Sequence, residues 1–349
     1  IALSESQERM AVVIDKENLD LFMKEVEEED LEATVVARVT EEKVLRMFWK
    51  DHEIVNVSRE FLDTNGIRKN IKAQIEQPSE NNYLKEVPSK FKNTSIKDSL
   101  IELMKDLNIG SQKGLVENFD NTVGGGTLLM PYGGKYRLSP SEGMVAKIPV
   151  LGGNTKTCSI MTYGYEPKIS KWSPFHGGYY AVIESIAKVV ALCGDYSKVR
   201  LTFQEYFERL GEDEIKWGKP LSALLGAYKV QKELDIPSIG GKDSMSGTFE
   251  DIHVPPTLIS FAVVSENVDN IISNEFKEIG SNVVLLPLDI DDKGLIDFQQ
   301  LKSNYKKIKQ LADKHIILSA QSIKYGGIAR AISEMSFGNK IGFKFGKID

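Results

Sequence analysis

Two neighbouring stretches, TCSIMTYG (157–164) and PFHGGYYAVIESIAKVVALC (174–193), decide the fold that we expect. The first predicts a strand, because β-branched and aromatic residues recur in it. The second predicts a long helix, because Val182, Ile186 and Val189 recur at helical spacing on one apolar side. Strands that alternate with helices are typical of mixed folds, so we expect an α/β or α+β protein.

The same alternation continues on both sides of this pair. In the middle of the chain, strands are predicted at 143–150 and 257–264, and a second helix at 219–234 ends before Pro237. The opening and closing parts each predict a further α/β block, with these elements: strands at 7–14, 32–39 and 43–49, a helix at 16–28 and a short element at 55–57; then strands at 282–287, 315–319 and 341–345, and helices at 298–313 and 326–336.

The segment 67–95 has a different composition from the rest of the chain. It holds two prolines, several asparagines and lysines, and few large apolar residues, which is typical of a linker over the surface. A helical pattern begins at Ile96. We therefore expect an opening unit at 1–66, a linker at 67–95 and a folded region from residue 96 onward.

Composition and charge exclude several classes of protein. Of 349 residues, 44 are Lys or Arg and 50 are Asp or Glu, so the formal net charge is −6 and non-specific nucleic-acid binding is not expected. Two cysteines and four histidines cannot build a disulfide framework or a zinc cluster, and they favour a reducing, cytoplasmic setting. No apolar run has the length of a membrane span, and both ends are expected to be cut from a longer polypeptide.

The sharpest local signal for chemistry is GGKDSMS (240–246). Its two glycines allow a ligand to approach the backbone closely, and Lys242, Asp243, Ser244 and Ser246 could contact phosphate oxygens and a divalent metal. On composition alone a tight, solvated turn is the more frequent meaning of such a stretch. It is not a Walker loop, and no dinucleotide-binding glycine motif or nucleophile elbow is present.

Two further carboxylates are candidate metal ligands, and each also has a purely structural explanation. Asp120 ends a strand-like run and is followed by three glycines, so it could hold a metal, or it could cap a glycine-rich hairpin. Glu184 lies beside the apolar side of the helix at 174–193 and could be a metal ligand. Lys188 follows four residues later, so an i,i+4 salt bridge is the more frequent explanation of Glu184.

Four motifs in this order resemble phosphoribosylformylglycinamidine synthase, most closely its large fused form. They are SESQERM (4–10), DNTVGG (120–125), GDYSKV (194–199) and GKDSMS (241–246). The resemblance implies an N-terminal domain like that of aminoimidazole ribonucleotide (AIR) synthetase at 96–266, flanked by two partial C-terminal α/β domains. These would be the end of the first half's domain at 1–66 and the start of the second half's domain at 267–349.

The resemblance also implies the reaction. The family uses ATP and magnesium to activate the amide oxygen of formylglycinamide ribonucleotide, and ammonia from a glutaminase domain then displaces phosphate to leave an amidine. By position, the residues implied are Asp120, Glu184 and Asp243 for magnesium; Phe119, Lys242, Ser244 and Ser246 for ATP or ADP; and Glu5, Ser6 and Gln7 for substrate.

Three positions depart from the family pattern. Asn121 stands where the family often has arginine, Lys188 stands where it has an asparagine ligand, and Lys324-Tyr325 replaces an acidic pair before two glycines. The first half's N-terminal domain and the glutaminase are absent, so we expect the chain alone to be inactive. The alternative is a structural module whose nucleotide site is auxiliary or lost. Family N-terminal domains associate in pairs, so the two incomplete end pieces are expected to pair, either within one chain or between two chains in a homodimer.

Overall fold

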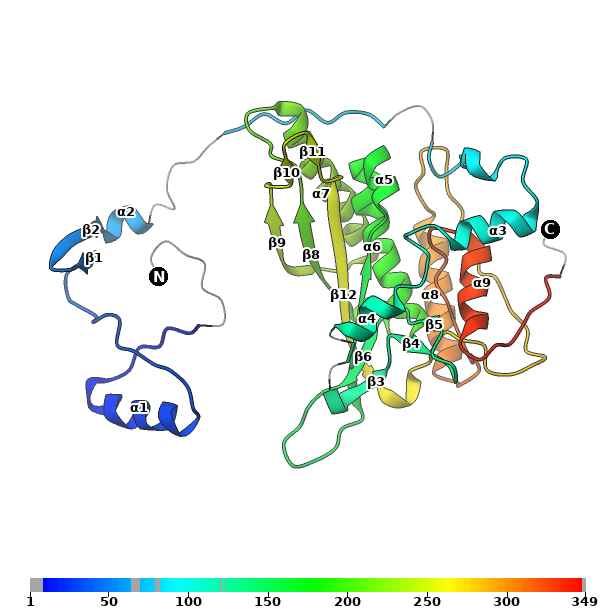
Figure 1. Ribbon diagram of the computed structural model, residues 1–349. Helices are drawn as coiled ribbons and strands as arrows, with labels where there is room; N and C mark the ends of the chain where they lie inside the picture. Colours follow the sequence, from blue (N-terminus) through cyan, green and yellow to red (C-terminus); the bar gives the residue numbers. More distant parts are fainter. Residues whose placement is uncertain (1–8, 64–69, 79–81, 120, 123, 347–349) are drawn as a thin grey trace. The chain divides into compact units, whose positions relative to one another are not determined.

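The computed structural model describes residues 9–63, 70–78, 82–119, 121–122 and 124–346 (Figure 1). The chain divides into two compact units, Ile1–Asn70 and Ile71–Asp349. This division falls inside the predicted linker. The identities given above to the segments 1–66, 96–266 and 267–349 remain predictions.

The first unit has little core of its own. It contains a 3₁₀ turn η1 (Lys16–Asn18), helix α1 (Leu19–Glu28), the antiparallel strands β1 (Val44–Trp49) and β2 (His52–Ser58), and helix α2 (Arg59–Asp63). No residue of the described range 9–63 is buried. A chain segment needs apolar burial to offset the entropy of ordering, so this unit lacks the packing that normally stabilises a domain.

The second unit is built on a six-stranded sheet. Its strands, in spatial order, are β3 (Thr127–Leu129), β6 (Met144–Lys147), β7 (Thr157–Gly164), β12 (Thr257–Asn267), β8 (Arg200–Tyr206) and β9 (Ser238–Ser244). Neighbouring strands are antiparallel except β8 and β9, which are parallel because a helix connects them. The predicted strands at 157–164 and 257–264 are confirmed.

Three helices, α5 (Pro167–Trp172), α6 (Pro174–Ala191) and α7 (Glu214–Leu234), lie on one side of this sheet (Figure 1). Apolar residues of α6 and α7 form the core with alternate residues of β7, β8 and β12. Helix α6 begins where predicted, because the Ser173 side chain caps it and Pro174 occupies its first turn. Helix α7 begins at Glu214, earlier than predicted, since Asp213 caps it and Pro220 lies inside it.

The remaining elements surround this core. They are helices α3 (Ile96–Met104), α4 (Lys113–Asn118), α8 (Phe298–Ala312) and α9 (Gly327–Phe337); the small hairpins β4 (Tyr132–Gly133) with β5 (Ser139–Pro140) and β10 (Thr248–Phe249) with β11 (Ile252–His253); and the 3₁₀ turns η2 (Ser89–Phe91), η3 (Gly124–Gly126), η4 (Tyr196–Lys198) and η5 (Val268–Asn270). The helices predicted at 16–28, 298–313 and 326–336 are confirmed. No helix in the described part of the chain is long and apolar enough to cross a membrane.

Five predicted strands are wrong over the residues that the structure describes. They are 9–14 (the described part of 7–14), 32–39, 282–287, 315–319 and 341–345. Their apolar side chains face water: Val36 is 75% exposed and Val284 is 76% exposed. A strand is defined by hydrogen bonds to a neighbour, and the described chain offers these segments none.

Candidate functional site

The GGKDSMS motif lies on β9, at the edge of the sheet. Successive side chains of a strand point to opposite faces, so Lys242 and Ser244 share one face and Asp243 points to the other. The Ser244 and Ser246 hydroxyls are 2.8 Å apart and share a hydrogen bond. The motif is therefore an exposed edge strand rather than the tight turn that was the alternative.

Asp243 has a carboxylic acid as its cross-strand neighbour. Glu205 of β8 is in register with it, on the helix-covered face, and only 8% of Glu205 is exposed. Burial first, and then the charge of Asp243, raises the pKa of Glu205 to about 7. Sequence reasoning missed Glu205, because nothing in its own segment marks it as the neighbour of Asp243.

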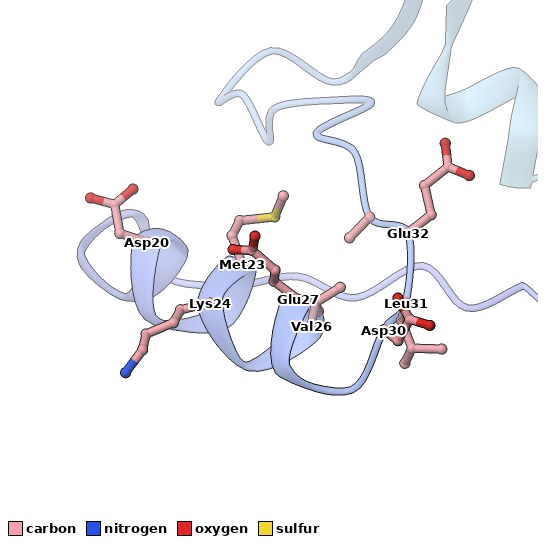
Figure 2. A pocket seen from close by; sticks show the side chains of 9 residues that line it. Asp20, Met23, Lys24, Val26, Glu27, Asp30, Leu31 and Glu32 are labelled. Atoms are coloured by element: carbon pink, nitrogen blue, oxygen red, sulfur yellow. The ribbon is translucent and has the colours of Figure 1, made fainter.

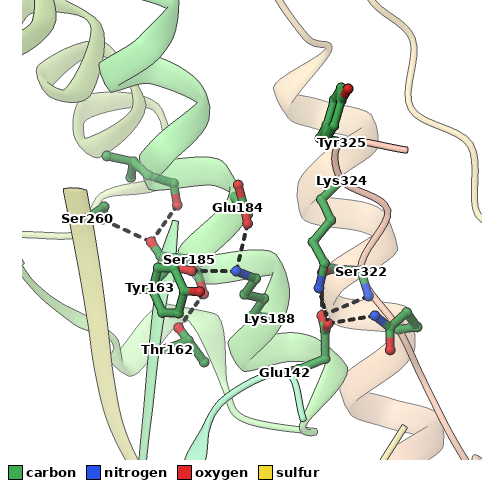
Figure 3. A network of polar contacts seen from close by, with 12 residues as sticks. Glu142, Thr162, Tyr163, Glu184, Ser185, Lys188, Ser260, Ser322, Lys324 and Tyr325 are labelled. Atoms are coloured by element: carbon green, nitrogen blue, oxygen red, sulfur yellow. Dashed lines mark hydrogen bonds and ion pairs between the residues drawn. The ribbon is translucent and has the colours of Figure 1, made fainter. Parts of the chain in front are cut away.

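Glu184 is held by a lysine of its own helix (Figure 3). The Lys188 Nζ atom lies 2.6 Å from Glu184 Oε1 and donates a hydrogen bond of 2.8 Å to the Tyr163 carbonyl oxygen. Strand β6 begins at Met144, opposite Met161, so this carbonyl lies beyond the end of their ladder. The structure has the i,i+4 salt bridge that was the alternative to a metal site.

A second buried carboxylate, Glu142, was not singled out in the sequence. It lies just before β6 and receives hydrogen bonds from four donors in one short segment: Lys324 Nζ at 2.7 Å, Gln321 Nε2 at 2.8 Å, the Ser322 backbone N–H at 3.0 Å and the Ser322 hydroxyl. Burial alone would raise the pKa of Glu142, but the charges of Lys324 and Lys188 and these hydrogen bonds hold it below its usual value.

The polar contacts continue on both sides of Lys324. Arg330 of α9 pairs with Glu334, whose other carboxylate oxygen lies 3.8 Å from Lys324 Nζ. The Tyr325 hydroxyl donates to Asp106, which also pairs with Lys168. Lys324 and Tyr325, which depart from the family pattern, therefore attach the segment 321–325 to Glu142, just before β6, and to Asp106, just after α3.

The predicted site residues are not all brought together. Glu184 and Lys188 lie beside the end of β7, whereas Asp243 is on β9, three strand spacings or roughly 14 Å away. Among the described residues, no group of three His, Cys, Asp or Glu side chains could hold a metal ion. Phe119 is exposed at the end of α4. Four predicted residues lie outside the described ranges: Glu5, Ser6, Gln7 and Asp120.

A separate groove of about 680 Å³ lies beside α1 in the first unit (Figure 2). Its lining combines acidic residues with one lysine and a few apolar side chains: Asp20, Met23, Lys24, Val26, Glu27, Asp30, Leu31, Glu32 and Ala33. It is open to solvent, and it contains none of the predicted site residues.

The chain matches one protein-family model and several curated proteins. Residues 1–50 match the family model described as AIR synthase related protein, C-terminal domain. The chain is 23% identical over 374 residues to phosphoribosylformylglycinamidine synthase subunit PurL of Thermoplasma volcanium, and 25% identical over 360 residues to that of Picrophilus torridus. Each alignment covers 98% of this chain, and 46% and 47% of the relatives.

Solved structures of PurL also match the fold of this chain. The structure of PurLQS from Thermotoga maritima matches with a TM-score of 0.62 and 20% identity, over 95% of this chain and 48% of that one. Structures of PurL from the same organism with ATP and with FGAR have TM-scores of 0.59. The mixed α/β fold related to AIR synthase and the resemblance to phosphoribosylformylglycinamidine synthase are thus confirmed. The chain spans about half the length of these relatives, which are named as subunits and do not test the likeness to the fused form.

Proposed function

We propose that this chain is part of an ATP-dependent carbon–nitrogen ligase of purine biosynthesis. The reaction would convert formylglycinamide ribonucleotide, ATP and glutamine to formylglycinamidine ribonucleotide, ADP, phosphate and glutamate. The observation that carries the proposal is the alignment of PurL relatives along 98% of the chain. The remainder of the synthase, including a glutaminase domain, would be its partner. Two free, buried cysteines are compatible with a cytoplasmic location.

The proposed nucleotide site lies at β9. Lys242 and Ser244 share a face and could contact phosphate oxygens, and the Asp243 side chain has no hydrogen-bond or ion-pair partner among the described residues. A magnesium ion bound with the nucleotide would take Asp243 as an oxygen ligand, with Asp120 as a further predicted one. Glu184 does not fit this role, because Lys188 already occupies its carboxylate.

Titration with ADP in the presence of magnesium tests this site. We expect Asp243→Asn to weaken ADP binding about tenfold or more, equivalent to about 1.4 kcal/mol, because the variant loses the charge that would hold the metal. Asp251→Asn is the matched control, since Asp251 is also an exposed aspartate and lies between β10 and β11. Isothermal calorimetry on the full chain measures both. Equal affinities for the two variants would contradict the placement at β9.

The second candidate function is a structural module whose nucleotide site is auxiliary or lost. The observation that favours it is the internal pairing of Glu184 with Lys188 and of Glu142 with Lys324. If the site is lost, the intact chain binds no ADP in the same titration, although it remains folded.

We further propose that the unpaired segments of the two ends complete each other, within one chain or in a homodimer. Val36 and Val284 lie in segments predicted as strands, and both are exposed. Exposed apolar strands tend to be paired or covered. Light scattering should show that Val36→Asp and Val284→Asp lower the associated fraction if the pairing is between chains. Thermal unfolding should show that they lower the stability if the pairing is within one chain. Leu107→Asp, at a residue 90% exposed outside these segments, should change neither property. No change in either property for any variant would rule out the pairing.

A further inference from the structure

The Glu184 carboxylate and its lysine form one half of a dense charged cluster. The Lys188 side chain is 6% exposed, and its ammonium group lies 4.3 Å from the centre of the Tyr163 ring as well as against Glu184 and the Tyr163 carbonyl. An ammonium group has three N–H donors and no lone pair when protonated, so Lys188 cannot ligate a metal. The position beside Glu184 is filled by a cation that belongs to the chain.

The other half of the cluster is arranged in the same way. Lys324 is 14% exposed in its side chain and contacts the fully buried Glu142 carboxylate at 2.7 Å. Burial alone would lower the pKa of Lys324, but Glu142 and Glu334 raise it and keep the ammonium group charged. Lys188 also acts on Glu142, because its charge lowers the pKa of that carboxyl. In Figure 3, Lys324 contacts Glu142 directly, whereas Lys188 contacts Glu184.

We propose that Lys188 and Lys324 are resident cations of this cluster, so that Glu184 and Glu142 hold the chain's own ammonium groups in place of a divalent metal ion. Magnesium prefers near-octahedral oxygen ligands at about 2.0–2.1 Å. Both Glu142 oxygens already accept hydrogen bonds, and Glu184 Oε1 is paired with Lys188. Two singly charged groups supply the positive charge that one divalent ion would supply. The negative charges of Glu184 and Glu142 are thus neutralised without a metal ion. This inference does not depend on whether the chain binds a nucleotide.

Manganese(II) binding to the full chain without nucleotide, followed by electron paramagnetic resonance, tests the proposal. We expect Glu184→Gln and Glu142→Gln to leave the number of manganese sites and their affinity unchanged from the unaltered chain. We expect Lys188→Asn to gain one site, because it frees Glu184 and adds an amide oxygen, and the Lys188→Asn/Glu184→Gln double variant to lose that site again. Asp243→Asn reports separately on any metal held at β9.

Two outcomes would overturn the proposal. The first is loss of a manganese site from the otherwise unaltered chain on Glu184→Gln or Glu142→Gln. The second is a folded Lys188→Asn variant, checked by circular dichroism, that gains no site. If Lys188→Asn does not fold, the two glutamine variants still decide. A chain that binds no ADP but gives the expected manganese results would refute the nucleotide proposal and leave this one standing.

Discussion

Replacing Lys324 with methionine is expected to lower the free energy of unfolding of the second unit by about 3–5 kcal/mol. The variant keeps the length of the side chain but removes the charge that contacts Glu142 at 2.7 Å. The Glu142 carboxylate has 0% exposure and would be left without its closest opposite charge. Breaking one partner of a buried ion pair costs more than the pair contributes, because the remaining charge has no water to solvate it.

Denaturant unfolding followed by tryptophan fluorescence measures this effect. The chain has three tryptophans, and a Trp49→Phe background leaves Trp172 and Trp217, both in the second unit. Lys306→Met, at an exposed lysine of α8, is the matched control and should change the stability by less than about 0.5 kcal/mol. The Glu142→Gln/Lys324→Met double variant should recover part of the loss. A Lys324→Met variant as stable as the control would show that the ion pair of Glu142 with Lys324 does not stabilise the second unit.

The second large effect is expected from Gly226→Ala, where α7 crosses α6. A Cβ atom at Gly226 would lie 1.9 Å from the Phe175 carbonyl oxygen, and one at Gly178 would lie 2.2 Å from the Ala223 carbonyl oxygen. Both obstacles are backbone atoms, so rotation of a side chain cannot relieve the contact and the helices must separate. We expect a loss of about 3 kcal/mol, at the upper end of the usual cost of overpacking.

Gly114→Ala provides the control for the change of residue itself. Gly114 lies inside α4, and a Cβ atom added there would have no other atom within 4 Å, so alanine should be neutral or stabilise by up to about 1 kcal/mol. Thermal unfolding of the two variants by circular dichroism compares them directly. Similar midpoints for Gly226→Ala and Gly114→Ala would mean that the close approach of α6 and α7 is not needed for packing.

The helices could be predicted from the sequence because their signals are local. Ser173 and Asp297 cap α6 and α8 beside clear apolar spacing, and both helices lie where expected. The strands at 32–39 and 282–287 had the right composition but no neighbour in the described chain to pair with. Strand formation depends on a distant partner, and composition does not report whether that partner is present.

In the candidate site, too, contacts within one element could be predicted from the sequence and contacts between distant segments could not. The i,i+4 spacing of Glu184 and Lys188 predicts their salt bridge, since both residues lie on one helix. Glu142 and Lys324 are 182 positions apart, so no local pattern could connect them. The GGKDSMS motif was found from its residues, but only the strand register reveals that Asp243 faces Glu205 and points away from Lys242.

The 182 positions between Glu142 and Lys324 also determine the order of events during synthesis. At about 5–20 residues per second, a ribosome would release Glu142 roughly 10–35 s before Lys324. Until then the carboxylate has no partner from the segment 321–324, and burying it would be unfavourable. The strands around it can pair beforehand, but the loop that carries Glu142 must stay hydrated on the nascent chain. Its burial is therefore a late step, which must wait until residues 321–324 have left the ribosome.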